Sequence, residues 1–158
     1  MKLQDFEQLH AIFQEHHVAL AYVFGSVAQG TEGPLSDIDI AVLFDESVSK
    51  ELQAEQEFSL VNSIGQVLKK ERIDIINLGR IRSPVLKHRA IFLGRPIFAA
   101  DEHLRVRFEK QVLEVYEDTK HLRHVTHTTM RRQIRERTFG NGALSPREKY
   151  IIQKHATR

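Results

Sequence analysis

The chain has 158 residues with a net charge of +2, and 41% of its residues are apolar, 28% are charged and none is cysteine. This length suits one domain with its own core, the composition is that of an ordinary globular protein, and the lack of cysteine excludes a disulfide framework, a thiolate zinc site and a cysteine nucleophile. The sequence has neither the run of about 18 apolar residues that crosses a membrane nor the apolar core of a signal peptide, so we expect a cytoplasmic protein without a membrane partner.

The first hundred residues predict helices and strands in turn. Apolar residues spaced three or four apart indicate helices, whereas continuous or alternating apolar runs indicate strands. Ser83 before Pro84 is a helix start, and Gly94 is a helix stop. The predicted helices span residues 3–16, 52–68 and 84–93, and the predicted strands span 18–24, 37–44, 72–78 and 95–99.

The last part of the chain predicts mostly helix. Apolar spacing after Asp101 indicates one long helix that reaches about Phe139, where glycines at 140 and 142 end it. Ser145, Pro146 and Glu148 form a capping-box pattern for a last short helix.

This part is also the basic part. Residues 1–100 contain 10 Lys or Arg and 13 Asp or Glu (net −3), whereas residues 101–158 contain 13 and 8 (net +5). Such asymmetry predicts contact with an anionic partner, either RNA or an acidic protein, with a solvated helix face as the alternative. Two clusters stand out in this part. The histidines His121, His124 and His127 favour a solvated or partner-facing helix over a metal site. The arginines Arg131, Arg132, Arg135 and Arg137 favour contact with a partner over RNA binding or a solvated face.

The chemistry is concentrated in the string GSVAQGTEGPLSDID, residues 25–39. Asp37 and Asp39 lie two apart on a predicted strand, so their carboxylates project from one face roughly 6 to 7 Å apart. Two bare charges at that distance repel by about 2.5 kcal/mol at an effective dielectric constant of about 20. Because stability alone would disfavour this arrangement, the pair predicts a divalent cation such as Mg²⁺.

Asp74 on the third predicted strand is a candidate third acid. Ile73 and Ile75 flank it as core residues would, which leaves Asp74 on the opposite face. The alternative is a surface acid paired with Arg72.

Gly25 and Ser26 end the first predicted strand and begin the same motif. Free backbone amides at such a turn bind anions, glycine permits close approach of a phosphate, and Ser26 adds a hydroxyl donor. A phosphate-binding turn opposite acids that carry Mg²⁺ is suited to phosphoryl or nucleotidyl transfer.

Gly-Ser followed after ten residues by Asp-x-Asp resembles the signature of the DNA polymerase beta-like nucleotidyltransferases. The strings FGSVAQG, SDIDIAVLF and RIDIINL further resemble the minimal nucleotidyltransferases, or MNT proteins. The resemblance covers about residues 1–100 and implies an α+β fold, with a small mixed β-sheet flanked by helices and a long C-terminal helix. It implies a nucleotidyltransferase core at 1–100, and a long helix and basic tail at 101–158 that pack on the core or on a partner.

The resemblance also implies roles for single residues. Asp37, Asp39 and Asp74 would bind the metal ions, two Mg²⁺ being expected, and Asp74 would also activate the attacking hydroxyl as the third acid. Gly25 and Ser26 would hold the triphosphate of ATP, the substrate.

Finally, the resemblance implies a partner. MNT proteins accompany HEPN ribonuclease toxins, so we expect a hetero-oligomer in which this chain transfers AMP to a tyrosine of the toxin and silences it. One alternative is a nucleotidyltransferase that acts on a small molecule or an RNA end, although only about 60 residues remain here for an acceptor-binding domain. The other is an antitoxin that blocks the toxin by contact alone.

Overall fold

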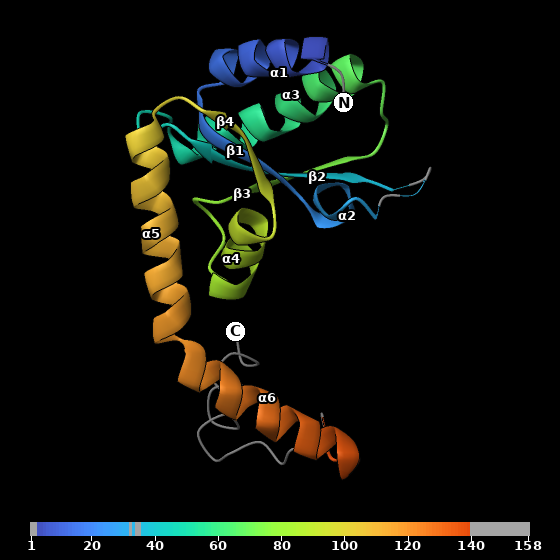
Figure 1. Cartoon of the computed structure of the whole chain (residues 1–158), viewed down its shortest axis with the longest axis vertical. Helices are drawn as coiled ribbons and strands as arrows, with labels where there is room; N and C mark the ends of the chain where they lie inside the picture. Colours follow the sequence, from blue (N-terminus) through green and yellow to red (C-terminus); the bar gives the residue numbers. More distant parts are fainter. Residues whose placement is uncertain (1–2, 32, 34–35, 140–158) are drawn as a thin grey trace, which may run out of the picture. The chain divides into compact units, whose positions relative to one another are not determined.

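The structure is a computed structural model that describes residues 3–31, 33 and 36–139. The chain divides after Asp118 into two compact units. The first contains the elements from α1 to α5 together with the β-sheet, and the second contains α6 (Lys120–Arg135) (Figure 1).

A four-stranded mixed sheet forms the centre of the first unit. The central strand β1 pairs antiparallel with β2 on one side and with β4 on the other, and β2 pairs parallel with β3, so the order is β3-β2-β1-β4. Because β1 is covered on both faces and both edges, its sequence is continuously apolar. All four predicted strands are confirmed: β1 Val18–Phe24, β2 Ile38–Phe44, β3 Ile73–Asn77 and β4 Arg95–Ala99.

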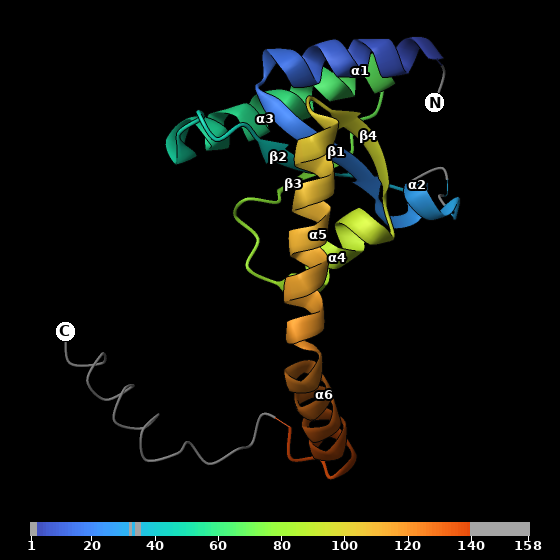
Figure 2. The ribbon, with the colours of Figure 1, turned by 60° about the vertical axis from the view of Figure 1, so that its left-hand side comes forward.

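Helices cover both faces of the sheet, as Figures 1 and 2 show. One face packs on α1 (Leu3–Glu15) and α3 (Lys50–Leu68), through side chains such as Phe13 and Ile64. The other face packs on α4 (Pro84–Phe92) and α5 (Glu102–Asp118), through Ile91 among others. The structure is therefore the α+β fold that the sequence predicted.

Two serines begin helices through their side chains, and the sequence predicted one of them, Ser83. The Ser49 hydroxyl accepts a hydrogen bond from the Leu52 amide at the start of α3, and Ser83 does the same for Leu86 at the start of α4. Gly94 then lets the chain turn from α4 into β4, since a Cβ there would lie 2.2 Å from the Ala90 carbonyl oxygen.

The helical stretch after Asp101 is present, but as two helices instead of one. Thr119 separates α5 from α6 with a ψ of 1°. The glycine stop at 140–142 and the short helix predicted around Ser145 lie outside the described residues. Among the helices that the structure does describe, none combines the length and the apolar character needed to cross a bilayer.

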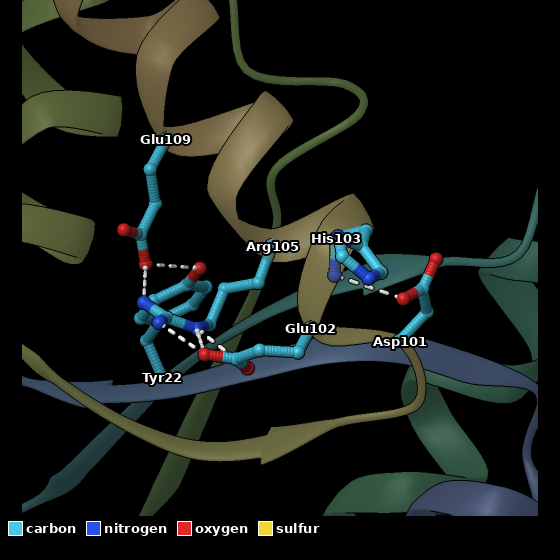
Figure 3. A network of polar contacts seen from close by, with 6 residues as sticks. All are labelled: Tyr22, Asp101, Glu102, His103, Arg105 and Glu109. Carbon is cyan, nitrogen blue, oxygen red and sulfur yellow. Dashed lines mark hydrogen bonds and ion pairs between the residues drawn. The ribbon is translucent and has the colours of Figure 1, made fainter.

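A polar network attaches α5 to the sheet (Figure 3). The buried Tyr22 hydroxyl on β1 donates a hydrogen bond to Glu109 Oε1 at 3.0 Å, and Arg105 Nη1 donates to the same oxygen at 2.6 Å. Arg105 also pairs with Glu102. Burial raises the pKa of the Tyr22 phenol, and the nearby Glu109 charge raises it further. The phenol therefore stays protonated and remains a donor.

We expect Tyr22→Phe to lower the free energy of unfolding by about 1 kcal/mol at pH 7, because Glu109 loses a buried donor. Because the pKa of the Tyr22 phenol is higher in the folded than in the unfolded protein, the protonated phenol stabilises the fold. This contribution is fully present below the unfolded pKa of roughly 10 and is lost as the pH rises above that value. Urea denaturation at pH 7 and pH 10.5 should therefore show a larger alkaline loss for the wild type than for Tyr22→Phe. Equal losses would contradict the assignment.

Candidate active site

The five predicted site residues lie at one end of the sheet. This is the end where β1 finishes and where β2 and β3 begin, because β1 is antiparallel to β2 and β2 is parallel to β3. Gly25 and Ser26 follow β1 directly and form the start of the short helix α2 (Gly25–Gln29). In the sheet register, Asp39 lies opposite Phe24 on β1 and opposite Asp74 on β3.

The acids point away from the α1–α3 core. Ile38 and Ile40, which alternate with Asp39, belong to that core, and so do Ile73 and Ile75 beside Asp74. Asp39 and Asp74 therefore lie on the sheet face that carries α4 and α5. This is the placement that the alternating sequence predicted.

The three acids interact electrostatically. Burial raises the pKa of Asp39, and the charges of Asp74 and then Asp37 raise it further. The sequence predicts repulsion between Asp37 and Asp39 with Asp74 as a third acid, and the charge of Asp74 does act on Asp39 in the structure. A cation at this position would relieve the repulsion.

Asp37 has an oxygen without a hydrogen-bond partner. Its side chain is 46% exposed, yet its Oδ1 is buried and accepts no hydrogen bond from the described residues. Arg72 Nη1 forms an ion pair with this oxygen at 3.8 Å, which is too long for a hydrogen bond. The partner that the sequence offered for Asp74, Arg72, thus lies beside Asp37.

The acids fit a divalent cation that completes its coordination with substrate oxygens. Within residues 3–31, 33 and 36–139, no three His, Asp or Glu side chains are arranged to hold one metal ion, so the expected set of three metal ligands, Asp37, Asp39 and Asp74, is not found. Mg²⁺, however, is usually bound by only one or two carboxylates together with water and substrate phosphates. The unpartnered oxygen of Asp37 and the crowded carboxylate of Asp39 make these two residues the candidate ligands.

Gly25 makes room for Asp39. Its φ is +70°, and a Cβ at this position would lie 2.0 Å from Asp39 Oδ2. A side chain at residue 25 would therefore displace the carboxylate, quite apart from any contact with a phosphate. The following residue, Ser26, is partly exposed, and its carbonyl oxygen accepts a hydrogen bond from the Thr31 amide at 3.0 Å.

The histidine and arginine clusters of the tail lie on and directly after α6. His121, His124 and His127 are exposed, and none of them belongs to a metal-binding group among the described residues. Arg131 and Arg135 are exposed on the same helix. Metal binding by these histidines therefore gains no support.

Comparison with known proteins agrees with this geometry. Residues 7–103 match the family model described as "Polymerase beta, Nucleotidyltransferase", a span that includes the whole sheet and all five site residues. The chain belongs to the polymerase beta nucleotidyltransferase family. No curated protein matches its sequence.

Solved structures share this nucleotidyltransferase fold. A toxin–antitoxin structure with AMP-PNP matches at 21% identity and a TM-score of 0.65, covering 78% of this chain and 96% of that one. A tri-AMPylated HEPN toxin in complex with MNT antitoxin, from Shewanella oneidensis, matches at 18% identity with a TM-score of 0.61. This match covers 82% of this chain and 98% of that one. The toxin–antitoxin MntA–HepT matches at 18% identity with a TM-score of 0.61, and the match covers 81% of this chain and 97% of that one. At these identities the likeness establishes the fold.

The contact between Gly25 and Asp39 can be tested with a matched glycine. Gly30 also has a positive φ, +69°, but nothing lies within 4 Å of a Cβ built on it. Gly30→Ala should therefore cost only the left-handed strain, about 1 to 2 kcal/mol, whereas Gly25→Ala should cost more. In an Asp39→Ala background the two costs should become similar, as measured by chemical denaturation of all variants. A difference that persists without the Asp39 carboxylate would contradict the close approach.

Proposed function

We propose that this nucleotidyltransferase is an antitoxin that transfers AMP from ATP to a tyrosine of a HEPN ribonuclease toxin and thereby neutralises it. The observation that carries the transfer is the gathering of Asp37, Asp39 and Asp74 opposite the Gly25 turn at one end of the sheet. The fold is shared with toxin–antitoxin structures, one with AMP-PNP and one with a tri-AMPylated HEPN toxin, which supports the choice of nucleotide and partner.

In this proposal each site residue has one task. Gly25 and Ser26 bind the triphosphate, while Asp37 and Asp39 hold the Mg²⁺ that, when bound, neutralises the phosphate charge. Asp74 accepts the proton of the toxin's tyrosine. The phenolic oxygen then bonds to the α-phosphorus, the bond from that phosphorus to the oxygen bridging to the β-phosphate breaks, and pyrophosphate leaves with the electron pair.

Asp39→Asn is the sharpest test of this reaction. The amide cannot balance a metal charge, so we expect AMP transfer to fall by at least about a hundredfold. The measurement is the intact mass of a co-expressed HEPN partner with each variant. Glu55→Gln, a neutralised exposed acid on α3, is the control and should transfer AMP normally.

The same variant should remain folded. Because the pKa of the Asp39 carboxyl is raised in the folded state, its contribution to stability is present below the unfolded pKa of roughly 4. This contribution is lost as the pH rises above that value. At pH 7 the charged Asp39 is thus unfavourable, and Asp39→Asn should melt no lower than the wild type. An Asp39→Asn protein that still labels the toxin would contradict the catalytic assignment.

The alternative antitoxin mechanism predicts a different result in cells. If Asp39→Asn still protects cells fully from the toxin, contact instead of AMP transfer is the antidote. If the wild type labels an RNA end or a small molecule but not the toxin, the proposed tyrosine acceptor is wrong, whereas the proposed nucleotidyl transfer is supported.

We further propose that α6 is the surface that holds the partner. Its sixteen residues include five Lys or Arg and no Asp or Glu, and none of its side chains is buried. His124, His127, Arg131 and Arg135 are spaced three and four apart and share one face. Apolar side chains are also exposed on this helix, Leu122 at 66% among them. A helix of this length gains little stability alone, so an acidic protein surface that covers it would stabilise it.

Arg131→Glu tests this surface. It should weaken binding of the co-expressed HEPN toxin by about threefold to tenfold, more strongly at low salt than at high salt. Lys110→Glu, an equal charge change on the exposed side of α5, is the control. Isothermal titration of each variant gives the dissociation constants, and equal values for both variants would refute the assignment.

A further inference from the structure

Arg72 is held beside the acidic site by its backbone. Its carbonyl oxygen accepts a hydrogen bond from the Ile38 amide at 3.1 Å, at the point where β2 and β3 begin. The register of these parallel strands pairs Ile38 with Ile73, so the residues before them, Asp37 and Arg72, are neighbours as well. The position of the Arg72 α-carbon is therefore fixed by the sheet.

The side chain of Arg72 reaches the Asp37 carboxylate from the protein surface. It is 68% exposed, and its Nη1 reaches Asp37 Oδ1 only at 3.8 Å. Exposed ion pairs of this kind contribute little to stability and are screened by salt. A divalent cation, which carries twice the charge and can approach the oxygen much more closely, would displace the guanidinium readily.

The oxygen that Arg72 faces can still accept a cation. Asp37 Oδ1 is buried and accepts no hydrogen bond from the described residues. Its carboxylate also adds to the repulsion on Asp39. A positive charge beside Asp37 therefore relieves the metal-free site in the way that a metal ion would.

We propose that Arg72 is a resident counter-ion of this site, which neutralises Asp37 in the metal-free protein and competes with the divalent cation for it. The inference rests on the proposed function, in which Asp37 and Asp39 bind the metal. Arg72 then lowers the affinity for free metal ions by competing with them for Asp37, without contacting them. The metal binds more favourably once a nucleotide supplies phosphate oxygens as further ligands.

Titration with Mn²⁺ in the absence of nucleotide tests the competition. Free Mn²⁺, followed by electron paramagnetic resonance, gives the dissociation constant of the wild type, Arg72→Gln and Lys70→Gln. Arg72→Gln should bind Mn²⁺ about threefold to tenfold more tightly than the wild type, because a positive charge close to the site is removed. Lys70→Gln removes the same charge from a neighbouring exposed position and should change the affinity by less than about twofold.

A second measurement guards against a general loss of stability in Arg72→Gln. The rise in melting temperature on saturation with Mn²⁺ should be larger for Arg72→Gln than for the wild type, whatever their starting values. Unchanged affinity in Arg72→Gln would overturn the proposal, and weaker affinity would show that Arg72 orients Asp37 for the metal. A wild type that binds no Mn²⁺ would refute the metal site itself, whereas Mn²⁺ binding of equal strength in all three proteins would refute only the counter-ion role.

Discussion

Repulsion among three carboxylates governs the end of the sheet where β2 and β3 begin. The parallel register places Asp39 opposite Asp74, and Asp37 lies one step before β2 on the same side. The isoleucines that alternate with these acids anchor both strands in the α1–α3 core, so the acids cannot turn away from one another. The rest of the sheet thus supplies the stability that holds these like charges together.

Much of this arrangement could be predicted from the sequence because its signals are local. Apolar periodicity predicts the strands and helices, Ser83 predicts the start of α4, and the alternation of Ile and Asp predicts that the acids share one face. The cap that Ser49 provides for α3 was not predicted. The spacing from Gly25 to Asp39 then indicated a nucleotidyltransferase, a family that residues 7–103 match.

What escaped prediction depends on how strands meet. The approach of Asp39 to Gly25 follows from the pairing of β1 with β2 and from the positive φ of Gly25. The spacing of residues in the sequence predicts neither. The partner of Arg72 follows from the parallel register of β2 and β3, so the sequence offered Asp74 where the structure has Asp37. The break between α5 and α6 at Thr119 contains neither glycine nor proline, and the sequence therefore predicts one continuous helix.

Tyr22 has a consequence for a transferase whose proposed acceptor is a phenol. It projects from β1 into the packed layer between the sheet and α4 and α5, the side on which Asp39 lies. Its hydroxyl donates a hydrogen bond to Glu109, and burial together with the Glu109 charge raises the pKa of the phenol. The tyrosine nearest in sequence to the Gly25 turn is thus enclosed within the fold, with its hydroxyl engaged by Glu109 and not open to solvent.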